Sequence, residues 1–387
     1  MARKAPRRTV ILGALLLLLL VVVFAVNYYY AADAVTRSRD FQSNVPLADN
    51  TNTSSSRITH SPDATADNEA LRYIPHTTLQ TWSERDYLIV FGIPSVDIAS
   101  RRSRRSLQRS TCWQFPGVAR RANNFTGDML VLYVLARHPS HGYRYSAALL
   151  KEVEAYHDVI TLPMNEGRPS TKNLEYSSSS WGLEAQIALS RKVFLWFDLA
   201  LRLFPRIRYI TKADDDVFVR VPQFLSDLRL LPLRGIYWGR AFPALVRRGN
   251  VSVKFRYTSG MCYTLSRDVA KHFVSYEPLR RLVHLPYSKE REKDFVSLNM
   301  SFEDVMVGRI LLVESRYTPL FFVAEYPCRF PIIHNGSVSS MESAMFVVVH
   351  QQGEDEYALL MDMFGNGTTY MPGVRYFPRR KYIKFVC

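Results

Sequence analysis

The sequence predicts an α/β protein, because short apolar runs alternate with longer segments of helical character. The runs YLIVFGI at 87–93 and MLVLYVLA at 129–136 have the continuous apolar character of strands that are buried on both faces. A length of 387 residues is sufficient for one large domain with a tail attached. In open sheets of this class, ligands bind beyond the carboxyl ends of the strands.

The elements that follow repeat the same order. The segment 145–156 carries an apolar stripe at helical spacing, and the strand DVITLP at 158–163 comes next. The segment 181–204 predicts a longer helix that ends at Pro205, and it leads into RIRYITKADDDVFVR at 206–220. An order of strand, helix and strand predicts parallel pairing with right-handed crossovers.

The N-terminus indicates a membrane anchor. Basic residues within 1–9 precede an uncharged apolar segment, 10–32, which is long enough to cross a thin bilayer of about 27 Å. The alternative is a cleaved signal peptide, with small residues at 31–34 as its cleavage site. Basic residues before the anchor predict a cytoplasmic tail at 1–9 and a luminal remainder, in a single-pass type II topology. The polar segment 33–84 predicts a disordered stalk, and 85–387 the folded domain.

The composition is strongly basic, with 50 Lys and Arg against 35 Asp and Glu and a formal net charge of +15. Nucleic-acid binding is not expected, because zinc-finger spacing, a basic heptad helix and an aromatic RNA-binding signature are all absent from the sequence. The positive charge is clustered in short runs, and most of these runs are expected to be solvated surfaces.

Cysteines and glycosylation sequons agree with a luminal location. Cys112, Cys262, Cys328 and Cys387 allow three pairings in an oxidising compartment, and their spacing does not resemble a zinc site. Six N-x-S/T sequons are candidate glycosylation sites: Asn52, Asn124, Asn250, Asn299, Asn335 and Asn366.

Three consecutive carboxylates, Asp214, Asp215 and Asp216, follow an apolar strand. Side chains two residues apart on an extended segment share a face, so Asp214 and Asp216 are expected to project together and Asp215 elsewhere. A pair of carboxylates at a strand end suits a hard divalent cation that holds a diphosphate. The alternative is a solvated turn, which is poorly placed between two apolar runs.

Five blocks in the same order resemble the beta-1,3-galactosyltransferase-like enzymes, glycosyltransferase family 31. KADDDVFV at 212–219 matches the signature of that family. The other blocks are RRSLQRSTCW at 104–113, YTSGMCYTLSRDVA at 257–270, FEDVMVG at 302–308 and MFVVVHQ at 345–351. The resemblance covers roughly residues 85–360, and the chain looks closest to the trypanosomatid branch. It implies a GT-A fold, a Rossmann-like mixed sheet flanked by helices that binds a nucleotide sugar.

The resemblance also implies roles for the residues of the strand end. Asp216 would bind Mn²⁺ or another divalent cation directly, Asp214 the ribose or the metal shell, and Asp215 a donor hydroxyl. His350 would complete the metal shell through a neutral imidazole, although a lone histidine is more often structural.

Further residues are candidates for binding the donor. Arg105 and Arg109 follow the first strand, where a guanidinium can pair with phosphate or with the uracil edge. A solvated loop is the alternative for both. Trp238, beside Tyr237, can stack on the sugar, although core packing is also open for these rings.

The Glu-Asp pair at 303 and 304 is the candidate for the acid-base chemistry. By the resemblance Asp304 is the general base, and Glu303 assists it. Both carboxylates can also cap the helix that follows them.

The expectation is therefore a Golgi enzyme that transfers galactose or N-acetylglucosamine from UDP-Gal or UDP-GlcNAc to a glycan acceptor by inversion, with a beta-1,3 linkage. The alternatives are a carboxylate-metal phosphohydrolase and an inactive carbohydrate-binding relic. The donor, the acceptor and the oligomeric state are left open by the sequence.

Overall fold

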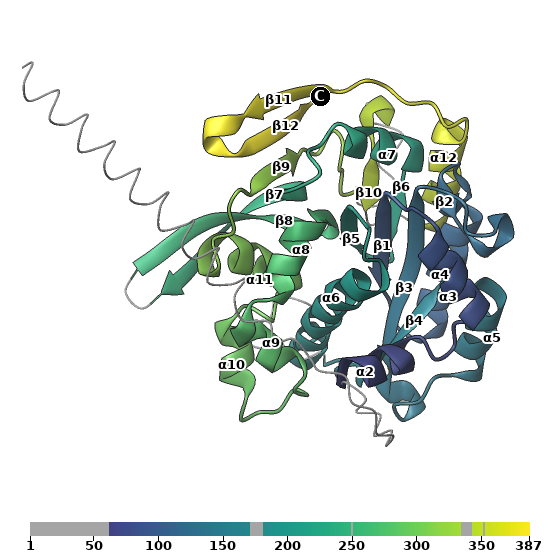
Figure 1. Ribbon diagram of the computed structural model, residues 1–387, viewed down its shortest axis with the longest axis vertical. Helices are drawn as coiled ribbons and strands as arrows, with labels where there is room; N and C mark the ends of the chain where they lie inside the picture. The colour runs from purple at the N-terminus through teal and green to yellow at the C-terminus, as the bar shows by residue number, and fades with distance from the viewer. Residues whose placement is uncertain (1–61, 171–180, 249–250, 334–342, 351–352) are drawn as a thin grey trace, which may run out of the picture. The chain divides into compact units, whose positions relative to one another are not determined.

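The computed structural model describes residues 62–170, 181–248, 251–333, 343–350 and 353–387 (Figure 1). The chain divides into two units, Met1–Thr59 and His60–Cys387, and every described residue belongs to the second unit. The predicted cytoplasmic tail, the membrane anchor at 10–32 and the stalk up to residue 61 lie outside the described residues. Within the described part of the chain, no helix combines the length and the apolar character that a membrane span needs.

A mixed sheet of ten strands lies at the centre of the described unit, in the order β11-β12-β9-β7-β8-β5-β1-β3, with β2 and β4 both pairing with β3. Two further strands, β6 and β10, form a separate antiparallel pair. The strands are β1 (Ile89–Pro94), β2 (Val118–Ala119), β3 (Met129–Arg137), β4 (Val159–Asn165), β5 (Tyr209–Ala213), β6 (Val217–Val219), β7 (Ile236–Arg248), β8 (Val251–Ser266), β9 (Phe321–Glu325), β10 (Val348–His350), β11 (Gly373–Phe377) and β12 (Tyr382–Val386).

Helices cover the sheet and connect its strands. They are α2 (Pro62–Ala70), α3 (His76–Glu84), α4 (Ala99–Ser110), α5 (Ala147–Tyr156), α6 (Leu183–Leu203), α7 (Val221–Arg229), α8 (Arg267–Val274), α9 (Glu277–Val283), α10 (Glu292–Ser297), α11 (Glu303–Arg309) and α12 (Glu354–Phe364). The predicted α/β class is therefore confirmed. The parallel pairing predicted from the strand order holds for β1, β3, β4 and β5, and the antiparallel strand β8 makes the sheet mixed.

Helix α6 is the main contact between the helical layer and the strands that lead to the aspartates. Its buried Trp196 lies directly over Gly92 of β1, where an added Cβ would come within 2.1 Å of the indole ring. The indole Nε1 donates to the carbonyl oxygen of Thr211 in β5 at 3.0 Å. A glycine in β1 thus lets the helix approach closely enough to hold β5, the strand that ends at Asp214.

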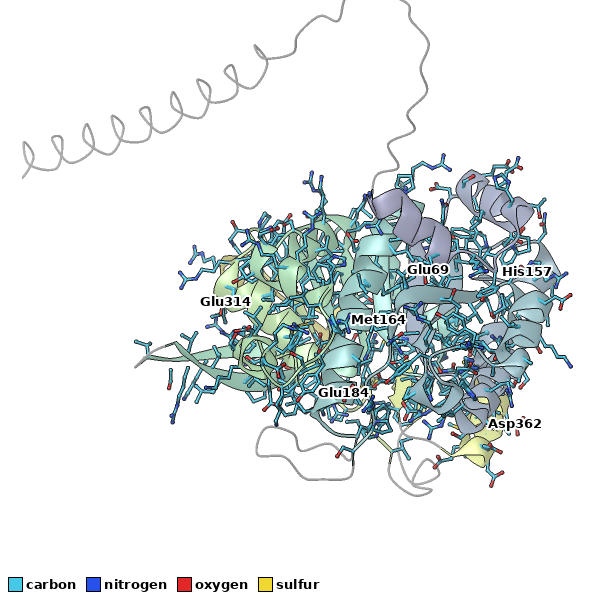
Figure 2. The ribbon with its side chains drawn as sticks, turned by 90° about the horizontal axis from the view of Figure 1, so that it is seen from below. Glu69, His157, Met164, Glu184, Glu314 and Asp362 are labelled. Atoms are coloured by element: carbon cyan, nitrogen blue, oxygen red, sulfur yellow. A yellow bond between two sulfur atoms is a disulfide. The ribbon has the colours of Figure 1, made fainter. Side chains whose placement is uncertain are left out.

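The predicted stalk boundary at residue 84 is wrong for the part that the structure describes. Residues 62–84 form α2 and α3, and the side chains of Ala70, Ile74 and Trp82 are buried in the main core. Glu69 of α2 pairs with Arg137 at the end of β3 at 3.1 Å, and Figure 2 labels Glu69 near Met164 of β4. The few large apolar residues of this segment are spaced so that they all face the domain, which overrides its polar composition.

The C-terminal segments are fastened to the sheet by a disulfide and by a buried arginine. Cys328 and Cys387 are bonded, while Cys112 and Cys262 are free and buried. Arg329, which is fully buried, pairs with Asp227 of α7 and with Glu325 of β9, and its carbonyl oxygen accepts from the backbone N–H of Val347 at 2.8 Å. This segment therefore holds the strand that ends at His350.

Candidate metal and catalytic site

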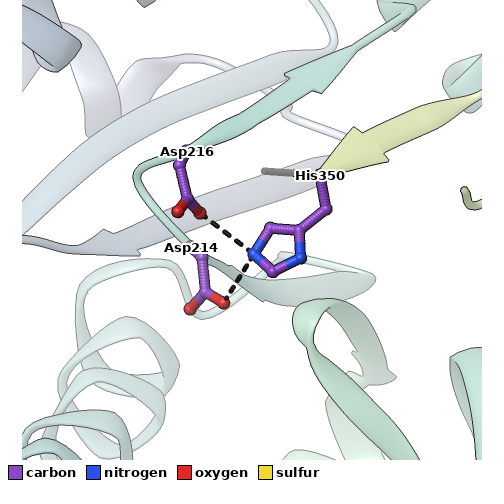
Figure 3. A group of neighbouring side chains, drawn as sticks. All are labelled: Asp214, Asp216 and His350. Atoms are coloured by element: carbon purple, nitrogen blue, oxygen red, sulfur yellow. Dashed lines mark ion pairs between the residues drawn. The ribbon is translucent and has the colours of Figure 1, made fainter. Parts of the chain in front are cut away.

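Two aspartates and one histidine meet where β5 ends. Asp214, Asp216 and His350 each offer one ligand atom, and these atoms lie within 4.8 Å of one another. The His350 Nε2 is 3.0 Å from an Asp216 oxygen and 3.5 Å from an Asp214 oxygen (Figure 3). The sequence-based expectation that Asp214 and Asp216 share a face is confirmed.

His350 is far from the aspartates in the sequence and belongs to β10. β10 pairs antiparallel with β6, which places His350 opposite Val217, directly after the aspartates. The backbone N–H of His350 donates to Pro331, and its carbonyl oxygen accepts from Ile333 at 2.9 Å. Pairing on both sides fixes the backbone of His350, so the direction of its ring is set by the sheet-like pairing rather than by a loop.

The electrostatics of this group suit a divalent cation. Burial opposes protonation of His350, but hydrogen bonds and charge from Asp214 and Asp216 raise its pKa to about 9. Burial also acts to raise the pKa of Asp214, yet the charge of Lys212 and the hydrogen bond from His350 hold it well below its usual range. Two ionised carboxylates around an imidazole nitrogen form a donor set that Mn²⁺ or a similar cation accepts. The His350 Nε2 faces both carboxylates, so it would have to be unprotonated to join them in holding a cation.

Asp215 points away from this group, as expected, but its environment differs from the prediction. It is buried, one oxygen accepts from Arg101 at 2.6 Å and the other from the Ser95 hydroxyl at 2.7 Å. Burial raises its pKa, and the charge of Arg101 opposes the rise. Both of its oxygens hold α4 and the residue after β1, and the contact of Asp215 with a donor hydroxyl stays a prediction.

Arg105 and Arg109 are not at the predicted donor site. Arg105 is fully buried in a two-point pair with Glu152, and Arg109 pairs with Glu152 and Asp158. Both arginines join α4 to α5, Arg109 also pairs with the residue before β4, and both guanidinium groups are already matched by carboxylates. Arg105 also donates to the Ser95 hydroxyl at 2.9 Å and to the carbonyl oxygen of Val96 at 3.0 Å, so it supports the segment after β1 that contacts Asp215.

Two other arginines of α4 contact the aspartates directly. Arg101 contacts Asp215, and Arg104 lies 3.1 Å from Asp216 with 39% of its side chain exposed. Residues three apart on a helix share a face, and Arg101 and Arg104 have this spacing. The sequence contained the whole basic run, but helical periodicity alone does not tell which side of the run faces the cleft.

Lys212 links the metal group to the Glu-Asp pair. Its buried Nζ donates to Asp214 at 2.6 Å, to the carbonyl oxygen of Gly260 at 2.6 Å and to Glu303 at 3.3 Å. A Cβ on Gly260 would lie 3.0 Å from the Glu303 Oε2 and 3.2 Å from the Lys212 Nζ, so a larger residue there would displace the ends of these two side chains. Lys212 lies within the KADDDVFV block, and the sequence alone assigned it no role. Its position two residues before Asp214 was the available signal, because both side chains lie on one face of β5.

The carboxylates of Glu303 and Asp304 begin α11 and lie beside Gly260. Glu303 is buried, accepts from the Tyr263 hydroxyl at 2.7 Å, and its pKa is raised to about 7 by burial, against the charge of Lys212. Asp304 accepts from the backbone N–H of Gly260 and of Val305, and burial raises its pKa. Asp304 therefore lies in the first turn of α11, where it accepts from a backbone N–H of its own helix, and its role as a general base stays a prediction.

Trp238 does not line the site. Its ring is buried among Phe224, Phe330 and Phe385, and its Nε1 donates to Glu325 at 2.9 Å. The predicted stacking on a sugar is corrected, because residues of β7 alternate between two faces and this face is covered by α7 and the C-terminal strands. Tyr237 is also a core residue.

The sequons differ in accessibility. Asn124 and Asn366 are exposed, whereas Asn299 is partly buried and its side-chain oxygen accepts from Arg309 at 2.7 Å. Asn52, Asn250 and Asn335 lie outside the described residues. Of the described sequons, Asn124 and Asn366 are accessible to modification in the folded state.

Fold and site together define an α/β protein with a carboxylate and histidine group for a divalent cation and an adjacent pair of buried acids. No protein-family model matches the chain. A stretch of 170 residues is 26% identical to the rat (Rattus norvegicus) lactosylceramide 1,3-N-acetyl-beta-D-glucosaminyltransferase, covering 38% of this chain and 39% of that protein. The chain thus spans about two fifths of the relative. Among solved structures it is similar to apo mouse xyloside xylosyltransferase 1, with a TM-score of 0.34 and 9% identity over 69% of this chain and 98% of that one.

The pKa of about 9 for His350 predicts that binding of a divalent cation releases a proton near neutral pH. Below pH 9 the imidazole is protonated and must lose this proton to become a ligand, so each unit of falling pH should weaken apparent affinity by about tenfold. Calorimetric titration with Mn²⁺ in two buffers of different ionisation enthalpy measures the release, which should approach one proton near pH 7 and vanish well above pH 9.

His350→Gln should bind Mn²⁺ more weakly and release no proton. His284→Gln alters an exposed histidine of another element and is the matched control. Binding by the parent chain near pH 7 without proton release would contradict the assignment of His350 as a ligand.

Proposed function

We propose that this chain is a glycosyltransferase of the GT-A type that uses a UDP-sugar and a divalent cation. The observation that carries the proposal is the link through Lys212 between the metal group, Asp214, Asp216 and His350, and the buried pair Glu303 and Asp304. A metal site and a base at the same strand end are what sugar transfer from a nucleoside diphosphate needs. The similarity to the rat 1,3-N-acetyl-beta-D-glucosaminyltransferase supports the same class.

The finer proposal is an inverting transfer of galactose or N-acetylglucosamine to a glycan hydroxyl, with a beta-1,3 linkage. When bound, the cation would neutralise charge on the departing diphosphate. Asp304 accepts the proton of the acceptor hydroxyl as that oxygen attacks the anomeric carbon, and burial, which raises its pKa, makes it a better base. Lys212 and the backbone N–H of Gly260 hold the two acids in place.

Arg104 is proposed as a binding residue for the diphosphate. Its guanidinium lies beside Asp216 and is partly exposed, so it can turn from the carboxylate to phosphate oxygens when a cation takes over the charge of Asp216. Arg101, which is more buried and bonded to Asp215, positions α4 for this contact.

The membrane topology remains a proposal on sequence grounds. The segment 10–32 would anchor the chain in the Golgi membrane as a single-pass type II protein, with residues beyond about 35 in the lumen. Protease digestion of the domain in sealed vesicles, without detergent, would refute this orientation.

The full chain should transfer sugar from UDP-galactose or UDP-N-acetylglucosamine to glycan acceptors when Mn²⁺ is present. Asp304→Asn should leave binding of UDP and Mn²⁺ nearly unchanged and lower the transfer rate by roughly 10² to 10⁴, because only the basic oxygen is lost. Single-turnover measurements of transfer isolate the chemical step from product release.

Each alternative has its own outcome in this experiment. UDP-sugar hydrolysis that does not accelerate with acceptor would indicate a phosphohydrolase, and binding of sugar without transfer would indicate a relic. An Asp304→Asn chain that transfers at the parent rate would remove Asp304 from the role of base.

Arg104→Gln and Arg109→Gln should change different properties, although the residues are five apart in one basic run. The first should affect UDP binding and the second the stability of the fold. Arg104→Gln should weaken UDP binding in the presence of Mn²⁺ by roughly ten- to hundredfold, because a charge-assisted hydrogen bond is lost. Arg109→Gln should instead lower the free energy of unfolding by about 1 to 3 kcal/mol, because the partly buried Asp158 loses its partner while Glu152 keeps its pair with Arg105. UDP calorimetry and urea denaturation of both variants measure the two effects, and a loss of UDP affinity only in Arg109→Gln would reverse the assignment.

A further inference from the structure

A cavity of about 80 Å³ lies between α2, the last part of β4, α6 and the end of α9. Its wall is mostly apolar and includes Ala70 of α2, Leu162 and Met164 of β4, and Leu195 and Leu199 of α6. Met164 is labelled in Figure 2. None of the described residues that line this cavity belongs to the metal group.

Arg191 of α6 brings a buried positive charge to the wall of the cavity. The residue is 7% exposed, and its Nε donates to the carbonyl oxygen of Val283, the last residue of α9, at 2.8 Å. Its two terminal nitrogens, Nη1 and Nη2, make no hydrogen bond and no ion pair with any residue that the structure describes. Because Arg191 lines the cavity, these two nitrogens are donors that remain available to a molecule inside it.

The charges around Arg191 do not neutralise it. Burial lowers the pKa of its guanidinium to about 10, the charge of Glu166 opposes this effect, and the charge of Arg291 adds to it. Glu166 already forms an ion pair with Lys192. The guanidinium therefore stays protonated at neutral pH without a carboxylate beside it, which is an unfavourable arrangement for a buried charge. An anion in the cavity would supply the missing partner.

The second arginine of the cavity, Arg202, is already matched by carboxylates. It pairs with Asp67 of α2 at 2.7 Å and with Asp198 of its own helix. Asp198 is seven residues after Arg191, which is about 10 Å along a helix that rises 1.5 Å per residue. The cavity thus has a cationic end at Arg191 and a distant end where two acids surround one arginine. An anion is expected at the Arg191 end alone.

The wall between the two ends suits a hydrocarbon group. Leu195 and Leu199 follow Arg191 at intervals of four residues, so the three side chains lie on one face of α6. A water molecule needs at least about 10–15 Å³ of such volume, so the cavity has room for roughly six groups of that size. A carboxylate with a short branched hydrocarbon tail is about this large.

We propose that this cavity binds a small monocarboxylate, with the carboxylate on Arg191 and the hydrocarbon tail beside Leu195 and Leu199. Nη1 and Nη2 can donate two parallel hydrogen bonds to the two oxygens of a carboxylate. Phosphate fits less well, because Asp67 and Asp198 would oppose its larger charge and its outer oxygens would meet apolar side chains.

A purely structural role for Arg191 explains less of the geometry. Capping the carbonyl oxygen at the end of α9 uses the Nε alone and leaves the rest of the guanidinium without a partner. The inference uses only the cavity and its charges and does not depend on the proposed sugar transfer, so it can fail or hold separately.

Isovalerate is the probe, and methyl NMR of the full chain with isotope-labelled methionine is the measurement. Met164 is buried and lines the cavity, so its methyl resonance, assigned with Met164→Leu, should shift and saturate. Isopentyl alcohol has the same tail without the charge, and acetate has the charge without the tail. Each should bind at least about tenfold more weakly than isovalerate. EDTA is present throughout, so that the metal group holds no cation.

Arg191→Gln should weaken isovalerate binding by roughly ten- to hundredfold, because charge-assisted hydrogen bonds are lost. Arg208→Gln removes an exposed arginine outside the cavity and is the matched control. Leu195→Phe keeps Arg191 and narrows the space for the tail, so it should weaken binding of isovalerate more than binding of acetate. Leu189→Phe makes the same change on α6 outside the cavity and should bind like the parent chain.

The two leucine variants decide the outcome if Arg191→Gln does not fold. A Met164 resonance that isovalerate does not shift, or equal binding of isopentyl alcohol, overturns the inference. Undiminished isovalerate binding by a folded Arg191→Gln chain also refutes it. Saturation by inorganic phosphate without saturation by isovalerate would replace it with an oxyanion site. These measurements need neither UDP-sugar nor acceptor, so their result is separate from the test of sugar transfer.

Discussion

Three adjacent carboxylates at the end of β5 are stable together only because a separate cationic group lies beside each one. Lys212 pairs with Asp214, Arg101 with Asp215 and Arg104 with Asp216, while the His350 Nε2 lies between Asp214 and Asp216. Unmatched charges at this depth would cost far more than the hydrogen bonds of the loop return. These cationic groups come from three elements: α4, β5 and β10.

That requirement explains why distant segments converge on one strand end. α4 brings its arginines across from β1, and β10 brings His350 from the last quarter of the chain. The position of His350 depends on the position of β10. The backbone N–H of Val347, directly before β10, donates to the carbonyl oxygen of Arg329, and the Arg329 side chain pairs with α7 and β9. Buried ion pairs away from the site thus set the geometry inside it.

The two edges of the sheet have different chemistry as a result of strand direction. The edge where parallel strands end gathers the acids, whose charge is balanced for a cation, and the edge where they begin gathers exposed arginines.

The α/β class, the main strands and the shared face of Asp214 and Asp216 follow from the sequence alone, because apolar runs and a period of two are local properties. The role of each arginine in α4 does not follow from it. Arg101 and Arg104 pair with the aspartates while Arg105 and Arg109 pair with Glu152, and only the packing of α4 between β1 and α5 decides which carboxylate each arginine meets. Packing likewise buried Trp238 and ordered residues 62–84, because burial depends on neighbours that are remote in sequence.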